Sequence, residues 1–343
     1  MVTVNNEIVI PVNLYRKYKD AGQEHVFQYI NELSEEKRTA FLQQMEGINV
    51  AETLVDFYAA KKLLERGQEN GSIKFAPLDE RSLIRSDLDM KKKFWEKGME
   101  AIRKGKVAAL TLAGGQGTRL GSSAPKGCYN IGLPSGASLF KLQALRLWKL
   151  ASLAGVSSTS IPWYIMTSST THTETVEYFK ANEFFGLPRK SVTFFKQDEL
   201  PAISKDGKLI LKRKDSLALS PNGNGGLYSA LNKERILYDM KRRGVECVHV
   251  FGVDNALVRP ADPAFIGGCI EYGSDFGNKT IIKTDPKESV GILCKGPDGK
   301  MIIAEYSELS SSLAEKRVAN GELLFSQANI ANHYFTIPLL ERI

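Results

Sequence analysis

The sequence predicts an α/β fold in which a mixed, mainly parallel sheet is flanked by helices and preceded by a helical N-terminal domain. Three observations lead to this prediction. Residues before about 105 show apolar spacing typical of helices, an apolar run at 107–112 ends in a glycine-rich loop, and strands then alternate with helices. We therefore expect a helical domain over residues 1–104 and an α/β domain over residues 105–343.

The N-terminal region is expected to form helices from residue 10 to residue 104. Apolar residues recur there at helical spacing, for example at Val26, Ile30 and Leu33. Ser86 and Asp89 form a capping-box pattern, which predicts a helix that begins at this point and ends near Gly105. The large apolar residues of this region are expected in its core.

The α/β pattern begins with a strand at 107–112, whose residues are apolar on both faces, as in a buried parallel strand. The next elements expected are a helix at 139–153, a strand at 163–166, a helix at 171–182 and a strand at 192–197. Thr171 and Glu174 have the spacing of a capping box. Ligands of parallel sheets bind beyond the carboxyl ends of the strands, so functional residues are expected there.

The second half of the chain continues this alternation after one interruption. Asp206-Gly207 predicts an inserted hairpin, and a second glycine loop follows at 221–226. The elements expected after it are a helix at 227–242 and strands at 248–253, 280–283, 290–294 and 301–306. Asp254 ends the first of these strands, and Asp262 is expected to cap the following helix.

The loop after the first strand has the composition of a phosphate and nucleotide cradle. Residues 112–126 read LAGGQGTRLGSSAPK. Glycines let backbone N–H groups close on an anion without intervening side chains, and Arg119 and Lys126 add positive charge. A structural turn between strand and helix is the alternative, but three glycines together with Thr, Arg and Lys favour the cradle.

Two common glycine motifs do not fit this loop. A Walker loop needs Gly-Lys-Ser/Thr, whereas Gly121 is followed by Ser122. A dinucleotide fingerprint needs a third small residue where this sequence has Leu120, and an acidic residue about 20 positions further on is missing. Neither motif therefore accounts for the loop.

The run LAGGQGTRLG followed by PKG resembles the UTP-binding loop of eukaryotic-type UDP-N-acetylhexosamine pyrophosphorylases, which make UDP-N-acetylglucosamine (UDP-GlcNAc). Further matches lie at 163–168, 221–228, 251–255 and 329–335. The resemblance implies the Rossmann-like sheet of nucleotide-diphospho-sugar transferases. It also implies a nucleotidyltransferase, a UDP-N-acetylglucosamine diphosphorylase of amino sugar metabolism, that makes UDP-GlcNAc and pyrophosphate from UTP and N-acetylglucosamine 1-phosphate.

The resemblance also implies roles for single residues. The catalytic residues would be Arg119 and Lys126, holding the β- and γ-phosphates, and the metal ligand for Mg²⁺ or Mn²⁺ would be Asp254. The nucleotide-binding residues would be Leu112, Ala113, Gly114, Gly115, Gly117, Thr118, Gln197 and Gly223. The sugar-binding residues would be Asn224, Gly291, Glu305 and Asn329.

The residue types at these positions suit such roles, although plainer readings exist. Gln197 offers the donor and the acceptor that the edge of uracil requires. A carboxylate at a strand end suits Mg²⁺, but Asp254 by itself could equally be a turn residue. Glu305 and Asn329, each taken alone, could be solvated strand ends. Nucleotidyl transfer needs alignment and charge neutralisation more than a general base, so the four isolated histidines are expected to be structural or surface residues.

The amino-acid composition is compatible with this function but does not distinguish it from others. The chain of 343 residues carries a net charge of +7, which suits an anionic substrate, but its basic residues are scattered and no nucleic-acid motif appears. Its four cysteines are well separated and show no zinc-ligand spacing, which fits a reducing compartment. With no leader-like or membrane-spanning run, we expect a cytoplasmic protein that binds neither nucleic acid nor membrane.

Two alternatives remain at this stage. One is a related uridylyltransferase that acts on another sugar 1-phosphate, with N-acetylgalactosamine or glucose, although Asn329 and the run Asn-Ile-Ala-Asn-His favour the N-acetylhexosamine branch. The other is a fragment that binds nucleotide sugars with impaired catalysis. The family's chain continues beyond the equivalent of Ile343, with a second lysine and a small β domain, so the α/β domain is expected to be incomplete at its C-terminal end.

Overall fold

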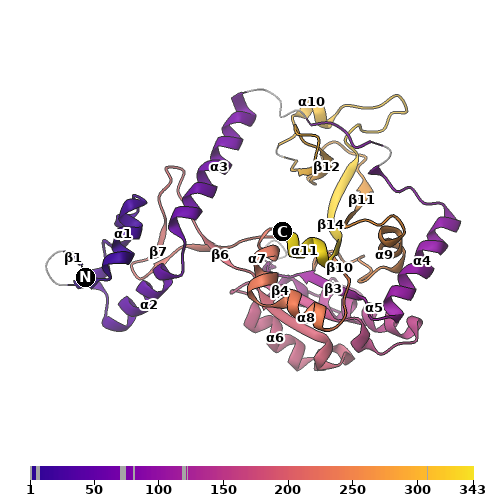
Figure 1. Cartoon of the computed structure of the whole chain (residues 1–343), viewed down its shortest axis with the longest axis horizontal. Coiled ribbons are helices and arrows are strands. Elements are labelled where there is room, and N and C mark those ends of the chain that lie inside the picture. The colour runs from indigo at the N-terminus through magenta and orange to yellow at the C-terminus, as the bar shows by residue number, and fades with distance from the viewer. Residues whose placement is uncertain are drawn as a thin grey trace. The chain divides into compact units, whose positions relative to one another are not determined.

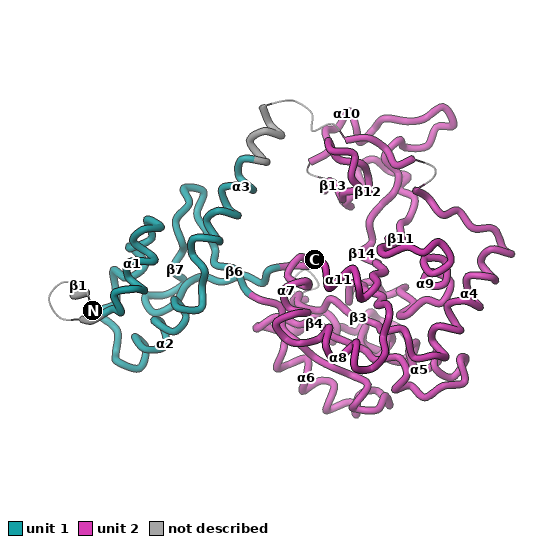
Figure 2. The backbone as a smooth tube through the Cα atoms, in the orientation of Figure 1, with its two compact units in different colours: residues 1–72, 199–222 teal, residues 73–198, 223–343 magenta. Residues whose placement is uncertain are grey.

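The computed structural model describes residues 2–4, 8–69, 75–79, 82–117, 121, 123–306 and 308–343. The chain forms two compact units (Figure 2). Unit 1 contains residues 1–72 and 199–222, and unit 2 contains residues 73–198 and 223–343.

Unit 1 combines the N-terminal helices with a later insertion of short strands. Its helices are α1 (Val12–Asp20), α2 (Glu35–Glu46) and α3 (Val50–Glu69), with the 3₁₀ turns η1 (Glu24–Phe27) and η2 (Ile30–Glu32). Its strands pair as β1 (Val2–Val4) with β2 (Ile8–Ile10), β6 (Glu199–Pro201) with β9 (Leu219–Pro221), and β7 (Leu211–Arg213) with β8 (Ser216–Leu217). The segment around Val26 and Ile30, expected to be α-helical, therefore forms 3₁₀ turns.

The insertion completes the core of unit 1. Leu209 and Leu217 pack into one cluster with the helical residues Tyr18, Phe27 and Phe41. The buried side chain of Gln23 binds both sides of the inserted hairpin, since its Nε2 donates to the carbonyl of Gly207 at 2.9 Å and its Oε1 accepts from the Leu209 N–H at 2.8 Å. The expected hairpin is thus present, and it belongs to the N-terminal unit.

Unit 2 is built on an eight-stranded mixed sheet (Figure 1). The order is β13 (Met301–Ala304), β12 (Ile292–Lys295), β14 (Gln327–Thr336), β10 (Cys247–Gly252), β3 (Val107–Leu112), β4 (Trp163–Thr167) and β5 (Val192–Lys196), with β11 (Phe276–Ile282) also paired to β14. Strands β10, β3, β4 and β5 are parallel, and β14 runs antiparallel to β10. The predicted α/β fold with a mainly parallel central sheet is confirmed.

Helices cover both faces of this sheet. Alternate residues of β3 point to opposite sides, with Val107 and Ala109 in one core cluster and Ala108 and Leu110 in the other. The first cluster includes buried residues of α4 (Leu88–Arg103), α5 (Leu139–Ala154), α6 (His172–Ala181) and α9 (Pro263–Glu271). The second includes residues of α7 (Gly226–Lys233), α8 (Ile236–Arg242) and α11 (Ile337–Arg342). The remaining helix, α10, is the short turn Ser311–Ala314.

Helix α4 packs against α9 within unit 2, so the two units divide at residue 72 and not at the expected residue 104. The helices approach very closely, because a Cβ on Gly98 would lie 2.0 Å from the carbonyl oxygen of Pro263. A Cβ on Gly267 would lie 1.8 Å from the carbonyl oxygen of Phe94. The side chain of Asp87 caps α4, in place of the expected Ser86.

Other element boundaries differ in detail. The helix expected at 227–242 is two helices separated at Arg235, whose φ is +56°. Asp262 caps α9 as expected, accepting from the Ala264 N–H. Thr171 precedes α6 without capping it, since its hydroxyl accepts instead from the Ser168 N–H. None of the helices in the described part of the chain is both long and apolar enough to span a membrane.

Candidate active site

The glycine loop leaves β3 between the ends of two neighbouring strands. The Ala113 N–H donates to the carbonyl of Met166 on β4 at 2.7 Å, and the Val253 N–H after β10 donates to the carbonyl of Leu112 at 3.0 Å. The loop therefore begins at the carboxyl edge of the parallel strands, where the sequence predicted the site.

The loop returns to its own starting point. The Gly117 N–H donates to the carbonyl of Ala124 at 2.9 Å, and the Lys126 N–H donates to the carbonyl of Gly115 at 3.2 Å. These bonds place Lys126 beside the first glycines of the loop. The expected site residues Thr118 and Arg119 lie outside the described residues.

Gln197 lies against the glycine loop from the β5 side. Its backbone N–H donates to the carbonyl of Thr167 at 2.8 Å, and its side chain is nearly buried, with the residue 6% exposed. A Cβ on Gly114 would lie 2.1 Å from the Gln197 Nε2, so only glycine leaves room for this amide. The Gln197 Oε1 is buried and has no hydrogen-bond partner among the described residues. A buried acceptor without a partner is unfavourable, and a ligand that donates to it would remove that penalty.

Ser168 fixes the other side of Gly114. Its hydroxyl donates to the carbonyl of Gly114 at 2.8 Å and also contacts the hydroxyl of Thr171. Ser168 lies in the match at 163–168, and no role was predicted for it. Its function here is to hold the loop backbone in the position that Gln197 contacts.

Lys126 and Asp254 form an ion pair across the site. The Lys126 Nζ lies 3.0 Å from the Asp254 Oδ2, and the two side chains are 27% and 59% exposed. Lys126 opens a 3₁₀ turn, η5 (Lys126–Cys128), in which Gly127 is pressed under the ring of Phe140 on α5. The expected catalytic lysine and the expected metal ligand are therefore neighbours.

The site could hold a divalent cation that takes most of its ligands from water and substrate. Among the described residues, no group of three or more His, Cys, Asp or Glu side chains could hold a metal ion. The exposed carboxylate of Asp254 could supply one oxygen ligand, and Mg²⁺ commonly takes its remaining ligands from water and substrate phosphates. The residues present thus fit a cation that binds together with a nucleotide.

Three of the expected sugar-binding residues lie together at the antiparallel part of the sheet. The Asn329 N–H donates to the carbonyl of Gly291 at 2.8 Å, and a Cβ on Gly291 would lie 3.4 Å from the Glu305 Oε1. The Asn329 Oδ1 accepts from the Ala331 N–H at 3.1 Å and from the Asn278 amide at 3.4 Å. These bonds use the oxygen, whereas no hydrogen bond among the described residues uses the Asn329 NH₂ group, which could therefore donate to a ligand.

Gly223 and Asn224 form the turn that leads into α7. The Gly226 N–H donates to the carbonyl of Gly223, whose φ is +71°, and the Leu227 N–H donates to the carbonyl of Asn224. No hydrogen bond recorded for the described residues joins this turn, or the sugar-binding group, to the glycine loop. The expected nucleotide and sugar roles of the turn therefore remain predictions.

The three histidines of unit 2 have rings that contact other side chains, and the His172 Nδ1 lies 2.8 Å from the Thr167 hydroxyl. His249 is fully buried and bonds to the Asn332 side chain, and His333 stacks on Phe276. Burial lowers the pKa of both imidazoles to about 4. Burial, followed by the charge of Lys196, also lowers the pKa of His172. The buried imidazoles of His249 and His333 are therefore neutral at pH 7.

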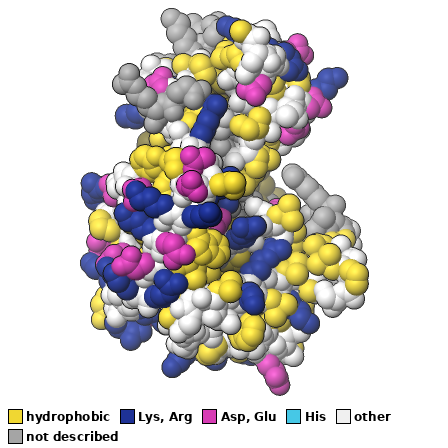
Figure 3. Space-filling view, turned by 90° about the vertical axis from the view of Figure 1, so that its right-hand side faces the viewer, with side chains coloured by type: hydrophobic (Ala, Val, Ile, Leu, Met, Phe, Trp, Pro, Cys, Tyr) yellow, Lys and Arg dark blue, Asp and Glu magenta, His cyan; other side chains and the backbone are white. Residues whose placement is uncertain are grey.

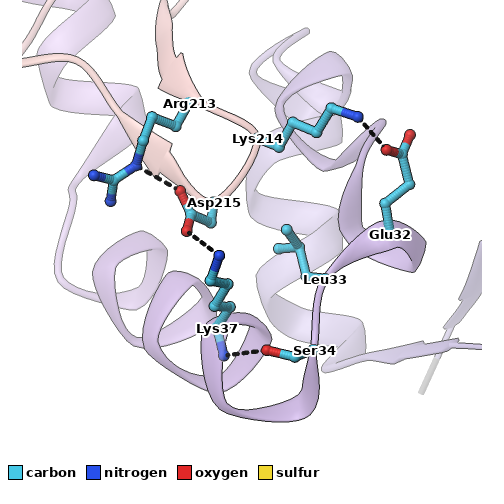
Figure 4. A pocket seen from close by; sticks show the side chains of 7 residues that line it. All are labelled: Glu32, Leu33, Ser34, Lys37, Arg213, Lys214 and Asp215. Atoms are coloured by element: carbon cyan, nitrogen blue, oxygen red, sulfur yellow. Dashed lines mark hydrogen bonds and ion pairs between the residues drawn. The ribbon is translucent and has the colours of Figure 1, made fainter.

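One further cavity of the described residues is lined by charged side chains that are paired with one another. A cavity of about 750 Å³ in unit 1 is lined by Glu32, Leu33, Ser34, Lys37, Arg213, Lys214 and Asp215 (Figure 4). Its cations are paired with its own acids, Arg213 and Lys37 with Asp215, and Lys214 with Glu32. On the face in Figure 3, Lys and Arg side chains stand at several places with acidic and hydrophobic side chains between them.

The fold and the site together define a Rossmann-like α/β protein. At the carboxyl edge of its sheet lie a glycine loop, a lysine–aspartate pair and a glutamine oxygen with no partner among the described residues. Residues 57–343 match the UTP–glucose-1-phosphate uridylyltransferase family. The chain belongs to this family.

Its relatives within the family are described as UDP-N-acetylhexosamine and UDP-N-acetylglucosamine enzymes. The chain is 42% identical over 339 residues to the human UDP-N-acetylhexosamine pyrophosphorylase-like protein 1, covering 94% of this chain and 65% of the relative. It is 41% identical over 341 residues to UDP-N-acetylglucosamine diphosphorylase 2 of Arabidopsis thaliana, covering 96% of this chain and 68% of the relative. The chain thus spans about two thirds of the length of these relatives.

A solved structure shows the same architecture. The uridine diphosphate N-acetylglucosamine pyrophosphorylase of Trypanosoma brucei, solved in complex with an inhibitor, aligns with a TM-score of 0.80 at 27% identity. The alignment covers 98% of this chain and 69% of that chain.

Proposed function

We propose that the protein transfers the uridylyl group of UTP to N-acetylglucosamine 1-phosphate, giving UDP-GlcNAc and pyrophosphate. The observation that carries the proposal is the placement of the glycine loop between Gln197 and Lys126, which suits a base at one side and phosphates at the other. The names of the family and of its relatives support uridylyl transfer.

Binding of the nucleotide would use both sides of the loop. The backbone at Gly114 and Gly115 and the amide of Gln197 would hold the uracil, whose edge offers an N–H to the unpaired Gln197 oxygen. Lys126 would contact the β- and γ-phosphates, and Arg119 would do so in the role that the family resemblance implies. A Mg²⁺ or Mn²⁺ ion on Asp254, when bound, would neutralise phosphate charge.

The transfer itself is a phosphoryl substitution. An oxygen of the sugar phosphate forms a bond to the α-phosphorus of UTP, and the bond between that phosphorus and the β-phosphate oxygen breaks, releasing pyrophosphate. The attacking oxygen is already ionised, so no histidine base is needed. Lys126 stabilises the departing charge, and a preorganised donor of this kind is worth on the order of a hundredfold in rate.

The Lys126–Asp254 ion pair has a consequence for binding. Each side chain is the other's partner at 3.0 Å, so a triphosphate that takes Lys126 frees the carboxylate of Asp254. The Asp254 carboxylate could then hold a divalent cation, whose remaining ligands would be water and phosphate oxygens.

Recognition of the sugar would use the cluster of Gly291, Glu305 and Asn329. The Asn329 NH₂ group can donate to a carbonyl or hydroxyl oxygen, and the Glu305 carboxylate can accept from a hydroxyl. Gly291 leaves room beside Glu305 because it lacks a side chain. Asn224 is proposed to contact the sugar from the α7 turn.

We also propose that the protein works in the cytoplasm. Its four cysteines are all free thiols, and burial raises the pKa of Cys128, Cys247 and Cys269 to about 12. Unpaired, unreactive thiols suit a reducing compartment.

The test is pyrophosphate release from UTP with Mg²⁺, comparing the 1-phosphates of N-acetylglucosamine, N-acetylgalactosamine and glucose. We expect release with the N-acetylated sugars and weak release with glucose. Asp254→Asn should abolish it, whereas Asp298→Asn, a matched control at an exposed aspartate paired with Lys300, should not. UTP binding without release would favour the binding-fragment alternative, and no UTP binding would refute the nucleotide site.

A further inference from the structure

The loop that follows β10 is held by two side chains of helix α5. The Gln143 Nε2 donates to the carbonyl of Val253 at 3.1 Å. The Arg146 Nη1 donates to the carbonyls of Ala256 and Val258 at 2.6 and 2.8 Å. Residues three apart lie on the same face of a helix, so both side chains can donate to backbone carbonyls of the same loop.

Gln143 is itself fixed by a buried chain of hydrogen bonds. The residue is 1% exposed, and its Oε1 accepts from the Thr111 hydroxyl at 3.3 Å. The Thr111 hydroxyl in turn accepts from the Trp163 Nε1 at 2.8 Å. Because both ends of the amide are used, its orientation is defined, and the bonds connect β4, β3, α5 and the loop without interruption.

Arg146 is a partly buried cation, and removing its charge from water is unfavourable. Desolvation, followed by the charge of Arg259, lowers the pKa of Arg146. Its two bonds to carbonyl oxygens are charge-assisted, and such bonds are stronger than those between neutral groups. A guanidinium in this position thus gives the loop a firmer hold than an apolar side chain would.

This loop, residues 253–258, carries Asp254, whose side chain is 59% exposed. A side chain this exposed has few packing contacts, so the position of the carboxylate depends on the backbone of the loop and on the ion pair with Lys126. We propose that Gln143 and Arg146 are positioning residues that hold this backbone and so place the Asp254 carboxylate for a divalent cation. The inference rests on the proposed function, in which Asp254 binds that cation.

The experiment measures Mn²⁺ binding to the 343-residue chain in the presence of UTP, by electron paramagnetic resonance. Gln143→Leu removes the bonds at similar volume, and Arg146→Lys keeps the charge but lacks the planar fork. We expect each to weaken Mn²⁺ binding about tenfold or more, as is typical for groups that orient a metal ligand. UTP binding without metal should change by less than about twofold, because neither side chain touches the proposed uracil or phosphate contacts.

A double variant separates positioning from a general structural effect. Gln143→Leu in an Asp254→Asn background should cause no further loss, since it acts through the carboxylate that is already neutralised. Lys149→Met, an exposed position on the same helix, should leave Mn²⁺ binding unchanged. If Gln143→Leu fails to fold, Arg146→Lys provides the same comparison.

Two results would overturn the inference. The first is full Mn²⁺ affinity in folded Gln143→Leu and Arg146→Lys proteins while Asp254→Asn loses it, which leaves the proposed function intact. The second is an undiminished loss from Gln143→Leu in the Asp254→Asn background. If Asp254→Asn itself binds Mn²⁺ and UTP normally, the metal role in the proposed function is wrong, and the inference fails with it.

Discussion

Replacement of Gly114 by alanine tests the uracil site through steric contact alone. The added Cβ would lie 2.1 Å from the Gln197 Nε2, whereas ordinary contact begins at 3.4 Å. The amide must therefore retreat by more than about 1 Å, which is enough to break a normal hydrogen bond. The added Cβ would also lie 3.2 Å from the Gln197 Cδ, so the whole amide group, and not Nε2 alone, must move.

The magnitude follows from the bonds that are lost. Two neutral hydrogen bonds to the uracil edge contribute about 0.5–1.5 kcal/mol each. Their loss of about 1–3 kcal/mol corresponds to a rise of about 5- to 150-fold in the Kd for UTP. Isothermal titration calorimetry with UTP measures this directly, and thermal unfolding shows whether the variant is folded.

A double-mutant cycle decides whether Gln197 is responsible. Gln197→Ala removes the amide that the new methyl group would displace, so Gly114→Ala should add almost nothing in that background. If Gly114→Ala leaves the Kd unchanged, or adds its full loss on top of Gln197→Ala, the assignment of Gln197 to the uracil is wrong.

Three further predictions concern catalysis, packing and pH. Lys126→Met should lower the rate constant of pyrophosphate release about a hundredfold in stopped assays, and a loss of less than tenfold would contradict its phosphate role. Gly267→Ala should lower the free energy of unfolding in urea by about 1–3 kcal/mol or more, because its Cβ meets the Phe94 carbonyl at 1.8 Å. Gly268→Ala, whose Cβ would lie 3.3 Å from the Phe94 ring, should be milder. Burial holds the pKa of His249 at about 4, below its ordinary 6.5, so the unfolded chain binds the proton more readily. The contribution of neutral His249 to the free energy of unfolding is therefore complete above pH 6.5 and falls by on the order of 3 kcal/mol as the pH drops to 4. Urea unfolding at several pH values should show this loss of stability, and the loss should be smaller in His249→Gln.

The sequence was informative wherever local pattern determines structure. The apolar runs at β3, β4 and β10 predicted strands, the first of them buried, and all three are buried almost throughout. Glycines together with Arg119 and Lys126 predicted a loop whose backbone is free to close on an anion. These features depend on neighbours in the chain, which the sequence displays directly.

Contacts between segments that are distant in the chain were harder to predict from the sequence. Nothing local shows that Leu209 and Leu217 complete the core of the N-terminal helices. The break at Arg235 does leave a trace, because the buried positions before it and those after it do not continue one helical face; they are Leu227, Ala230 and Leu231, then Ile236, Leu237 and Met240. A reading of helical phase across charged residues could have found it.

Gln143 shows what the sequence could have revealed about the site. It lies between apolar residues on the buried stripe of α5, beside Phe140, Ala144 and Leu147. A glutamine in such a stripe needs partners, because burying an unpaired amide is unfavourable. Its presence therefore signalled a buried polar contact, although the identity of the contact, the Val253 carbonyl, required the fold.

The order of the strands explains why the site residues meet. Leu112 on β3 is in register with Gly252 on β10, so the glycine loop and Asp254 begin two residues further on, at the same level of adjacent strands. Thr167 on β4 is in register with Lys196 on β5, which brings Gln197 beside the segment that holds Gly114. Because these four strands are parallel, the loops that follow them all leave the sheet at the same edge. Loops after neighbouring strands therefore bring their residues together there. The order of the strands therefore brings together the glycine loop and the segments that carry Asp254, Ser168 and Gln197. A change of register by a single residue between β3 and β10 would separate Lys126 from Asp254.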